Sequence, residues 1–220
     1  MFEFNKVKVI GATQPLVDYI PDSEGILSYA ARVSNPSNQG NFDTAEGLLK
    51  YCVRNKHYSV FETCSITMGI ETPRDIARQI LRHRSFSFQE FSQRYAEATN
   101  FIKRECRMQD DKNRQNSLEC FDEDTAHVWS VMQDEVMTVA KKNYQHALSI
   151  GIAKEVARTI LPEGLTVSKM YMNGTLRSWL HFIQVRDDEG IAQKEVVDVA
   201  RKVKVEILKL YPFLEEIIDA

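Results

Sequence analysis

The chain has 220 residues, 43% of them hydrophobic and 27% charged, with a formal net charge of −3. This composition excludes a disordered or fibrous chain, and the length favours one domain over residues 1–220 with a sizeable core. The mild acidity argues against a broad nucleic-acid-binding surface, which is usually basic.

The first 62 residues predict one strand followed by two helices. The alternating, β-branched segment KVKVIGAT predicts a strand that ends at Gly11. Apolar residues at helical spacing predict one helix that begins near Asp22 and another that begins near Thr44. The turn-forming residues 34–41 are expected to form an exposed loop between these helices.

A strand and a helix lead into an unusual basic segment. The alternation in FETCSITMGIET predicts a strand with one wet face, and Cys64, Ile66, Met68 and Ile70 share the other face. Pro73 opens a helix, PRDIARQILRHR, which should end where the arginines gather.

Helices dominate the second half of the chain. The polar residues 104–115 are expected to form a loop or an irregular edge, and residues 122–149 a long helix that Gly151 stops. Residues 152–161 predict a short helix with an apolar stripe, which Pro162 ends. A strand, LTVSKMYM, then leads through Asn173-Gly174 into the helix TLRSWLHFIQVR, and residues 193–210 predict a last long helix.

Strands and helices do not alternate regularly along this chain. We therefore predict an α+β fold: a single, helix-dominated domain with a small, mostly antiparallel sheet.

The cysteines and the N-terminus indicate a reduced, soluble environment. Cys52, Cys64, Cys106 and Cys120 have no C-x-x-C spacing and no nearby histidine pattern, so we expect free thiols and no metal site. The N-terminus lacks the apolar core of a signal peptide, and no apolar run approaches membrane-spanning length. We expect a cytoplasmic protein without membrane contact.

The stretch RHRSFSFQEFSQRY, residues 82–95, is the strongest candidate for function. Basic residues in the last turn of a helix interact favourably with its dipole, which would explain one or two of them without any ligand. That explanation does not cover Arg78 and Arg82, which repel each other at an i, i+4 spacing. The functional interpretation is an anion site in which arginines and hydroxyls bind phosphate.

The neighbouring side chains leave two interpretations open. SFSFQ is either a half-buried strand with a polar outer face or a phosphate-binding segment with its hydroxyls on one side. Glu90 would be repelled by phosphate, so it more reasonably accepts hydrogen bonds from a base or sugar, or orients an arginine. Arginines, hydroxyls and one carboxylate together suggest a nucleotide.

A second basic group follows the long helix. Arg158 lies off the apolar stripe of its helix, whereas Arg177 and His181 share a polar face and Arg186 comes at the helix end. Taken alone, each of these residues could be a solvated cation without a ligand, and His181 could also be a hydrogen-bonded histidine in the core. The chain contains no G-x-G-x-x-G, phosphate-loop or G-x-S-x-G motif.

These motifs together resemble the flavin-dependent thymidylate synthases. Arg82-His83-Arg84, followed after seven residues by Ser92, matches the signature of that family. Four further blocks also match, in the family's order: AARVS (30–34), KHYSVFE (56–62), EVARTILP (155–162) and LRSWLHFIQVR (176–186). The resemblance covers nearly the whole chain and implies a fold of the thymidylate synthase-complementing protein type.

The resemblance implies a reductive methylation. In such a family dUMP receives a one-carbon unit from methylenetetrahydrofolate, FAD reduced by NADPH supplies the hydride, and the product is dTMP. It also implies a homotetramer with sites shared between subunits, in which Arg84 and Arg158 meet across chains. The family assigns the role of activating the uracil ring to the arginine at the position of Arg186, without a cysteine nucleophile.

The resemblance also assigns contacts residue by residue. It implies that the dUMP contacts are Gln79, Arg82, Glu90, Phe91, Ser92, Gln93, Arg94, Arg158 and Arg186. It implies that the FAD contacts are Ser34, Ser59, Glu62, Arg82, His83, Arg84, Glu90, Thr175, Arg177 and His181. Gln89, Gln93 and Thr175 differ from the residues that are frequent at these family positions.

One alternative belongs to a different functional class. An RNA-binding or nucleotide-binding module would use the arginine–phenylalanine stretch for phosphate contact and base stacking. It would bind single strands with steep salt dependence and would carry no flavin.

Overall fold

The computed structural model describes residues 2–98 and 100–218, and its centre is a four-stranded antiparallel sheet. The strand order is β1-β2-β6-β3. These strands are β1 (Lys6–Ala12), β2 (Ser65–Pro73), β3 (Ser87–Glu90) and β6 (Val167–Thr175). A separate hairpin pairs β4 (Arg107–Gln109) with β5 (Ser117–Glu119). The predicted α+β class is confirmed.

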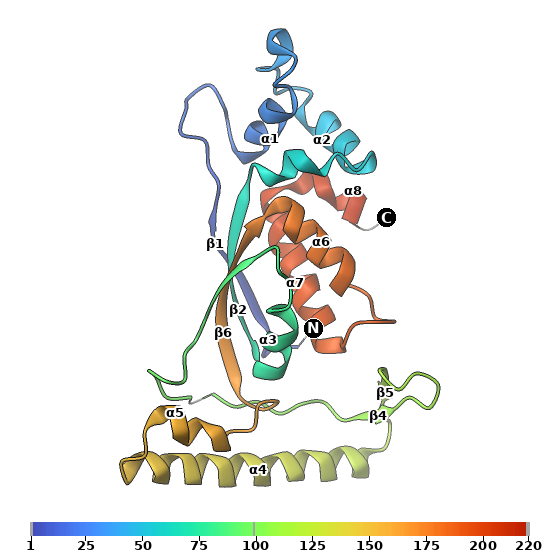
Figure 1. The fold of residues 1–220 in the computed structure, drawn as a ribbon. Coiled ribbons are helices and arrows are strands. Elements are labelled where there is room, and N and C mark those ends of the chain that lie inside the picture. Colours follow the sequence, from blue (N-terminus) through green and yellow to red (C-terminus); the bar gives the residue numbers. More distant parts are fainter. Residues whose placement is uncertain (1, 99, 219–220) are drawn as a thin grey trace.

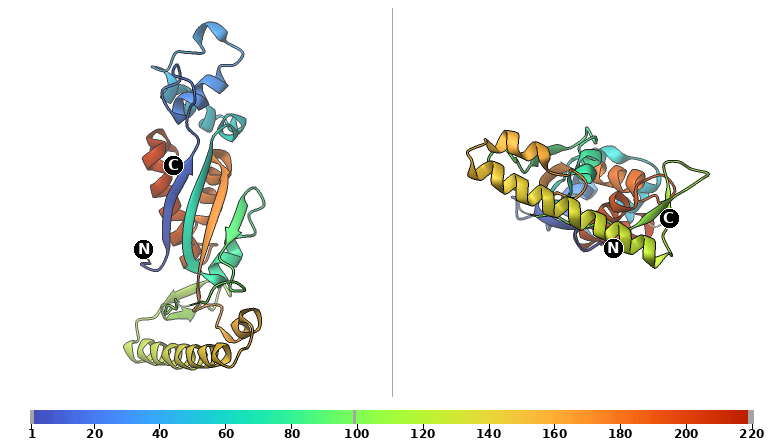
Figure 2. Two further views of the ribbon diagram at one scale, coloured as in Figure 1. Left: turned by 90° about the vertical axis from the view of Figure 1, so that its left-hand side faces the viewer. Right: turned by 90° about the horizontal axis from the view of Figure 1, so that it is seen from below.

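Helices cover one face of the sheet and both of its ends. The longer ones are α1 (Ser23–Ala31), α2 (Ala45–Arg54), α3 (Arg74–Ile80), α4 (Glu123–Ser149), α6 (Leu176–Arg186) and α7 (Lys194–Leu210). The short ones are η1 (Pro36–Asn38), η2 (Tyr58–Glu62), α5 (Lys154–Ala157), η3 (Arg158–Ile160), η4 (Pro212–Leu214) and α8 (Glu215–Ile218). Figure 1 shows α6 and α7 against one sheet face, α1 and α2 beyond one end, and α4 and α5 across the other. The opposite sheet face, which is turned to the viewer in the left panel of Figure 2, has no described helix over it.

The alternation predicted for the second strand is confirmed and builds the core. Cys64, Ile66, Met68 and Ile70 are all fully buried, and they join one continuous cluster with Trp179 of α6. Their buried side chains anchor the helices that carry the basic residues.

Asn173-Gly174 does not form the connection expected from the sequence, because both residues lie inside β6 and pair with β2 and, at Asn173, with β3. A Cβ atom at Gly174 would come within 2.4 Å of the Phe86 ring. The glycine is therefore required by the close approach of Phe86 to the strand.

The segment expected to be a loop or an irregular edge, residues 104–115, is irregular except for the three-residue strand β4. Each strand of the hairpin has only three residues, which is too short to leave a clear alternation in the sequence.

The long helix is confirmed, and the short helix predicted after it is present as α5 and η3. Asp122 caps α4 by accepting a hydrogen bond from the Thr125 amide, and Gly151 ends it with a φ of +88°. On the next helical turns only Ala157 is buried, whereas Val156 and Ile160 are 56% and 46% exposed. The reason is that α4 and α5 stand beyond the end of the main sheet rather than against its core (Figure 1).

Within the described residues, none of the helices combines the length and the apolar character that a membrane span requires.

Candidate functional site

Two helix ends bring the predicted basic residues together. β2 leads directly into α3 and β6 leads directly into α6, and these strands are antiparallel neighbours. The two helices therefore start from opposite ends of the sheet. Residues at the end of α3 and just after it meet the end of α6, so Gln79 and His83 lie beside Arg186.

Arg82, His83, His181 and Arg186 form what we call the cation cluster. The Arg186 Nε donates to His83 Nε2 at 2.8 Å, and an Arg186 terminal nitrogen donates to the Gln79 carbonyl oxygen at 3.5 Å. Burial, Arg186 and His181 lower the pKa of His83 to about 4. His83 is therefore neutral near pH 7, as an imidazole that accepts a hydrogen bond must be.

The cation cluster has no acidic partner of its own. Burial and the nearby Arg82 guanidinium lower the pKa of Arg186. Across residues 2–98 and 100–218, no carboxylate forms an ion pair with Arg82, Arg84 or Arg186. Two neighbouring guanidinium groups without a counter-charge favour the binding of an anion.

Three of the residues expected to contact flavin line a cavity beside this cluster. Glu62, Arg177 and His181 border a space of about 520 Å³ between η2 and α6. Glu62 and Arg177 form an ion pair across it. Arg84 is exposed, as is Ser59 on η2.

Thr175 and Ser34 have different surroundings. The Thr175 side chain caps α6 by accepting a hydrogen bond from the Ser178 amide at 3.3 Å. Ser34 lines a separate cavity of about 530 Å³ between α1 and α2. A single chain does not bring Ser34 to the residues around His181.

Glu90 is held by residues that the sequence did not reveal. Its Oε1 accepts a hydrogen bond from the Ser168 hydroxyl at 2.7 Å and lies 3.4 Å from an Arg74 nitrogen. Arg74 itself is largely buried. The expectation that Glu90 orients an arginine therefore has a structural counterpart, although the arginine is Arg74 rather than a member of the basic stretch.

The remaining nucleotide-contact candidates form a second group. Arg94 pairs with Glu155 at 3.3 Å, and the Arg158 Nε donates to the Glu155 carbonyl oxygen at the same distance. The Ser92 hydroxyl accepts a hydrogen bond from the Arg94 amide at 3.4 Å. This group lies where the chain leaves β3 and meets η3, with no recorded contact to the cation cluster.

The residues between these candidates differ in exposure. Phe91 is 36% exposed, whereas Gln93 is only 4% exposed and its Nε2 is buried without a hydrogen-bond partner. Phe86 packs edge-on against Trp179 with ring centroids 4.7 Å apart. Because Phe86 is buried in the core, it is not available for the base stacking that an RNA-binding module would need.

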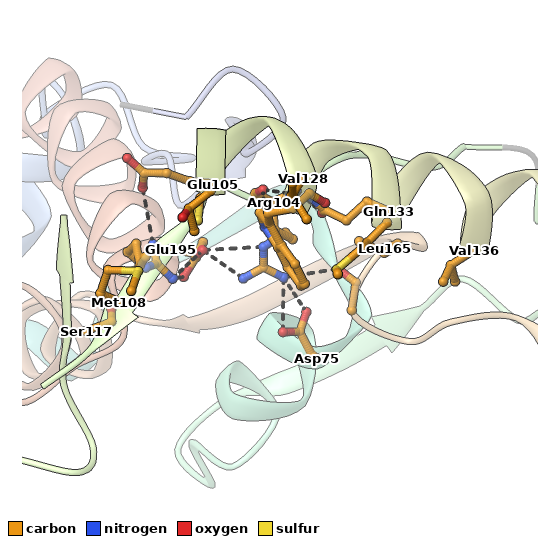
Figure 3. Close-up of a pocket in the computed structure, with 16 residues that line it drawn as sticks. Asp75, Arg104, Glu105, Met108, Ser117, Val128, Gln133, Val136, Leu165 and Glu195 are labelled. Atoms are coloured by element: carbon orange, nitrogen blue, oxygen red, sulfur yellow. Dashed lines mark hydrogen bonds and ion pairs between the residues drawn. The ribbon is translucent and has the colours of Figure 1, made fainter. Parts of the chain in front are cut away.

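A second arginine-rich region was not found from the sequence. Arg104 pairs with Asp75 and Glu195, and Arg107 pairs with Glu195, all at 2.8–2.9 Å. Figure 3 shows these side chains along a cavity of about 730 Å³ beneath α4. No short-range pattern could reveal them, because the partners lie about 30 and 90 residues apart in the chain.

Comparisons with known proteins indicate one family over nearly the whole chain. The model of a family described as thymidylate synthase complementing protein matches residues 15–213. A probable flavin-dependent thymidylate synthase of Paramecium bursaria Chlorella virus 1 is 46% identical over 213 residues, covering 96% of this chain and 98% of that protein. A flavin-dependent thymidylate synthase of Synechocystis sp. is 47% identical over 209 residues, covering 94% and 95%.

Solved structures of a related methylase also match nearly the whole chain, at lower sequence identity. A crystal structure of a UMP/dUMP methylase, PolB from Streptomyces cacaoi, bound with 5-Br UMP, superposes with a TM-score of 0.80 and 28% identity. The superposition covers 96% of this chain and 92% of the methylase chain. The same methylase bound with 5-Br dUMP gives a TM-score of 0.79.

Proposed function

The chain belongs to the family of flavin-dependent thymidylate synthases, and on this premise we propose that it methylates dUMP to dTMP. Methylenetetrahydrofolate is the proposed carbon donor, and FAD reduced by NADPH is the proposed hydride source. The structural neighbour named as a UMP/dUMP methylase, bound with a bromouridine nucleotide, supports the choice of substrate.

The observation that carries this proposal is the cation cluster. Arg186 is partly buried beside the exposed Arg82, and neither guanidinium has a carboxylate partner in the described chain. Such an arrangement is costly unless an anion completes it. A pyrimidine nucleotide supplies both a phosphate and a ring that can carry negative charge.

Arg186 is the proposed catalytic residue. A uracil ring becomes a better carbon nucleophile when its ring N–H loses a proton, and a guanidinium group stabilises the resulting anion by charge-assisted hydrogen bonds. The Arg186 Nε already donates to neutral His83. This bond and the long one from a terminal nitrogen to the Gln79 carbonyl oxygen orient the guanidinium, and the other terminal nitrogen remains as a donor to the ring.

The cysteines support a mechanism without a protein nucleophile. Burial raises the pKa of Cys52 and Cys64. Burial and neighbouring groups also raise the pKa of Cys106. A thiol with a raised pKa forms little of the thiolate that attacks carbon.

The residues around the Glu62–Arg177 pair fit a flavin. Arg82 and Arg84 have no acidic partner in the described chain and can bind a diphosphate, while His181 offers a ring nitrogen in the lining of the 520 Å³ cavity. His83 is proposed as a further flavin contact. Bound FAD, once reduced, would supply the hydride for the methylation. Ser34, Ser59, Glu90 and Thr175 complete the proposed flavin contacts.

The nucleotide contacts complete the proposed substrate site. They are Gln79, Arg82, Glu90, Phe91, Ser92, Gln93, Arg94, Arg158 and Arg186. Within the described residues, Arg94 and Arg158 share Glu155 as a partner and have no hydrogen bond or ion pair to the cation cluster, and we propose that a second chain completes this set.

We therefore propose a homotetramer with sites shared between subunits, in which Arg84 and Arg158 meet across chains. The supporting observation is an exposed apolar surface on α4 and the segment after it, formed by Val128, Met132, Val136, Val139, Val156 and Ile160. Exposed apolar surface of this extent is typical of protein interfaces. A cytoplasmic location belongs to the same proposal and agrees with four free cysteines.

Tritium release from dUMP labelled at the carbon that receives the methyl group tests the proposal directly. The purified protein should release tritium only when methylenetetrahydrofolate, FAD and NADPH are all present. Its flavin absorbance should bleach under NADPH when air is excluded. A colourless protein that never takes up FAD and releases no tritium would contradict the proposed function.

A further inference from the structure

A hydrogen-bonded chain connects Gln79, at the edge of the cation cluster, with the buried carboxylate of Glu195. Glu195 is fully buried at the start of α7 and pairs with Arg104 at 2.9 Å and Arg107 at 2.8 Å. Burial would raise the pKa of Glu195, but the two guanidinium groups outweigh this and hold it below its ordinary value. Glu195 is therefore ionised, and an ionised carboxylate only accepts hydrogen bonds.

Glu195 fixes the orientation of the Gln193 amide. The Gln193 Nε2 lies 2.9 Å from Glu195 Oε2. A side-chain amide can be turned over without changing its shape, but only its NH₂ end can donate to a carboxylate. The carbonyl oxygen of Gln193 must then point away from Glu195.

Gln193 in turn fixes the orientation of Gln79. The Gln79 Nε2 donates to the Gln193 Oε1 at 2.7 Å. Gln79 Oε1 accepts no hydrogen bond from the described residues. This oxygen is not fully buried, so it is open to solvent or to a ligand. The Gln79 backbone carbonyl lies 3.5 Å from Arg186, which places this free oxygen near the cation cluster.

We propose that Gln193 and Glu195 are positioning residues that set Gln79 as a hydrogen-bond acceptor toward the nucleotide. This inference rests on the proposed function. Gln79 then selects a ligand that offers an O–H donor at this point, such as a sugar hydroxyl. The single ring N–H of uracil is not this donor, because it is the proton that the ring is proposed to lose beside Arg186. A ligand with an acceptor there meets the Gln79 oxygen and is disfavoured, because the Gln79 amide cannot turn over without losing its hydrogen bond to Gln193 and placing two oxygens against each other.

The variant Gln193→Met keeps the length of the side chain but removes both hydrogen bonds. The dissociation constant for dUMP, measured by calorimetry, should rise about tenfold, because one hydrogen bond loses its geometry. FAD affinity should stay near that of the unchanged enzyme, and the melting temperature should fall only slightly, because Glu195 loses one hydrogen bond but keeps both guanidinium partners. Unchanged dUMP affinity in this variant would overturn the proposal.

The variant Gln193→Glu tests the donor and acceptor pattern rather than mere packing. Its acid form keeps the pattern, with an O–H that donates to Glu195 and a carbonyl that accepts from Gln79. Its ionised form can still accept from Gln79 but cannot donate to Glu195, and repulsion from Glu195 moves it away from the position that holds Gln79. The neighbouring carboxylate raises the pKa of the new group toward neutral pH.

The ratio of dUMP affinities between Gln193→Glu and the unchanged enzyme should therefore be near one at low pH and fall as the pH rises. Ionisation of the nucleotide phosphate affects both proteins and cancels in this ratio. The same ratio for Gln193→Met should not depend on pH. A pH-independent ratio for Gln193→Glu would contradict the inference.

A nucleotide without the sugar 3′-hydroxyl identifies the donor. Gln193→Met should weaken the binding of dUMP but not of this analogue, because the analogue lacks the donor. Equal weakening of both nucleotides would contradict the inference that Gln79 accepts from this hydroxyl. The unchanged enzyme separates this inference from the proposed function. If the unchanged enzyme neither binds dUMP nor releases tritium, the proposed function has failed. If the unchanged enzyme is active and both Gln193 variants bind dUMP as tightly as it does, the inference alone has failed.

Discussion

Two arginine-rich regions of this chain have opposite electrostatic arrangements. Around Arg104 and Arg107, each guanidinium pairs with Asp75 or Glu195, and the charges cancel within the fold. Around Arg82 and Arg186, the described chain supplies a neutral histidine and a backbone carbonyl but no carboxylate. The comparison teaches that the pairing of arginines, rather than their density, distinguishes a binding site from a structural network.

The comparison implies different consequences for stability and for activity. Removing a cation from the paired network leaves a buried carboxylate without one of its ion-pair partners, which destabilises the folded state. Removing a cation from the cation cluster relieves repulsion between like charges but takes away a ligand contact. The predictions below test this contrast.

The largest expected effect is a loss of stability in Arg104→Met. The Arg104 and Glu195 side chains are only 11% and 1% exposed, so Glu195 would lose one of its two buried partners. We expect the free energy of unfolding in urea to fall by about 3 kcal/mol. The matched variant Arg82→Met should unfold at the same urea concentration as the unchanged protein or a higher one, and equal losses in both variants would remove the contrast.

The next effect concerns Arg186→Lys and activity. A lysine keeps the charge but cannot donate to both His83 and a ring with planar geometry. Turnover should fall about 10²–10³-fold, as when one donor to a developing anion is lost. Flavin absorbance of the purified variant should be retained, and unchanged turnover would remove Arg186 from the mechanism.

A smaller effect is expected from Gly174→Ala, which links the core to the basic segment. The new methyl group would lie 2.4 Å from the Phe86 ring, so the segment that carries Arg82 and His83 would have to shift. Thermal unfolding should show a loss of about 1–3 kcal/mol. The variant Gly47→Ala, at a helical position with open space around it, provides the control and should not destabilise the protein.

The smallest effect is a pH dependence that arises from His83. Its pKa falls from 6.5 to about 4 in the folded protein, so the unfolded chain binds more protons between these values. His83 therefore contributes stability above pH 6.5 that is lost as the pH falls toward 4. With allowance for solvent screening of this half-buried group, the loss should be about 1 kcal/mol. The free energy of unfolding of His83→Gln, measured in urea between pH 6.5 and pH 4, should not show this loss.

Much of the fold could be predicted because local patterns agreed with the final packing. The alternation around Ile66 and Met68 matched a strand with one buried face, and Asp122 and Gly151 marked both ends of the long helix. The grouping of Arg82, His83 and Arg186 followed from the family resemblance, and the structure brings these three residues together.

The rest depends on contacts between distant parts of the chain. The short strand β4 is held by Arg107 and Glu195, which are 88 residues apart. Arg74 gives no sign in the sequence that it holds Glu90, and Gln193 gives none that it orients Gln79. The apolar residues after α4 follow a helical pattern, but the pattern alone cannot say whether a core or another surface covers them.

The most direct test of the central claim is the dissociation constant for dUMP in Arg82→Met, measured by calorimetry beside Arg78→Met. Both arginines are on or just after α3, but Arg78 is exposed and pairs with Glu163 at 3.0 Å. If unpaired arginines form the nucleotide site, Arg82→Met should weaken dUMP about tenfold or more, and Arg78→Met should bind like the unchanged enzyme. Equal affinity in all three proteins would show that the cation cluster does not bind the nucleotide.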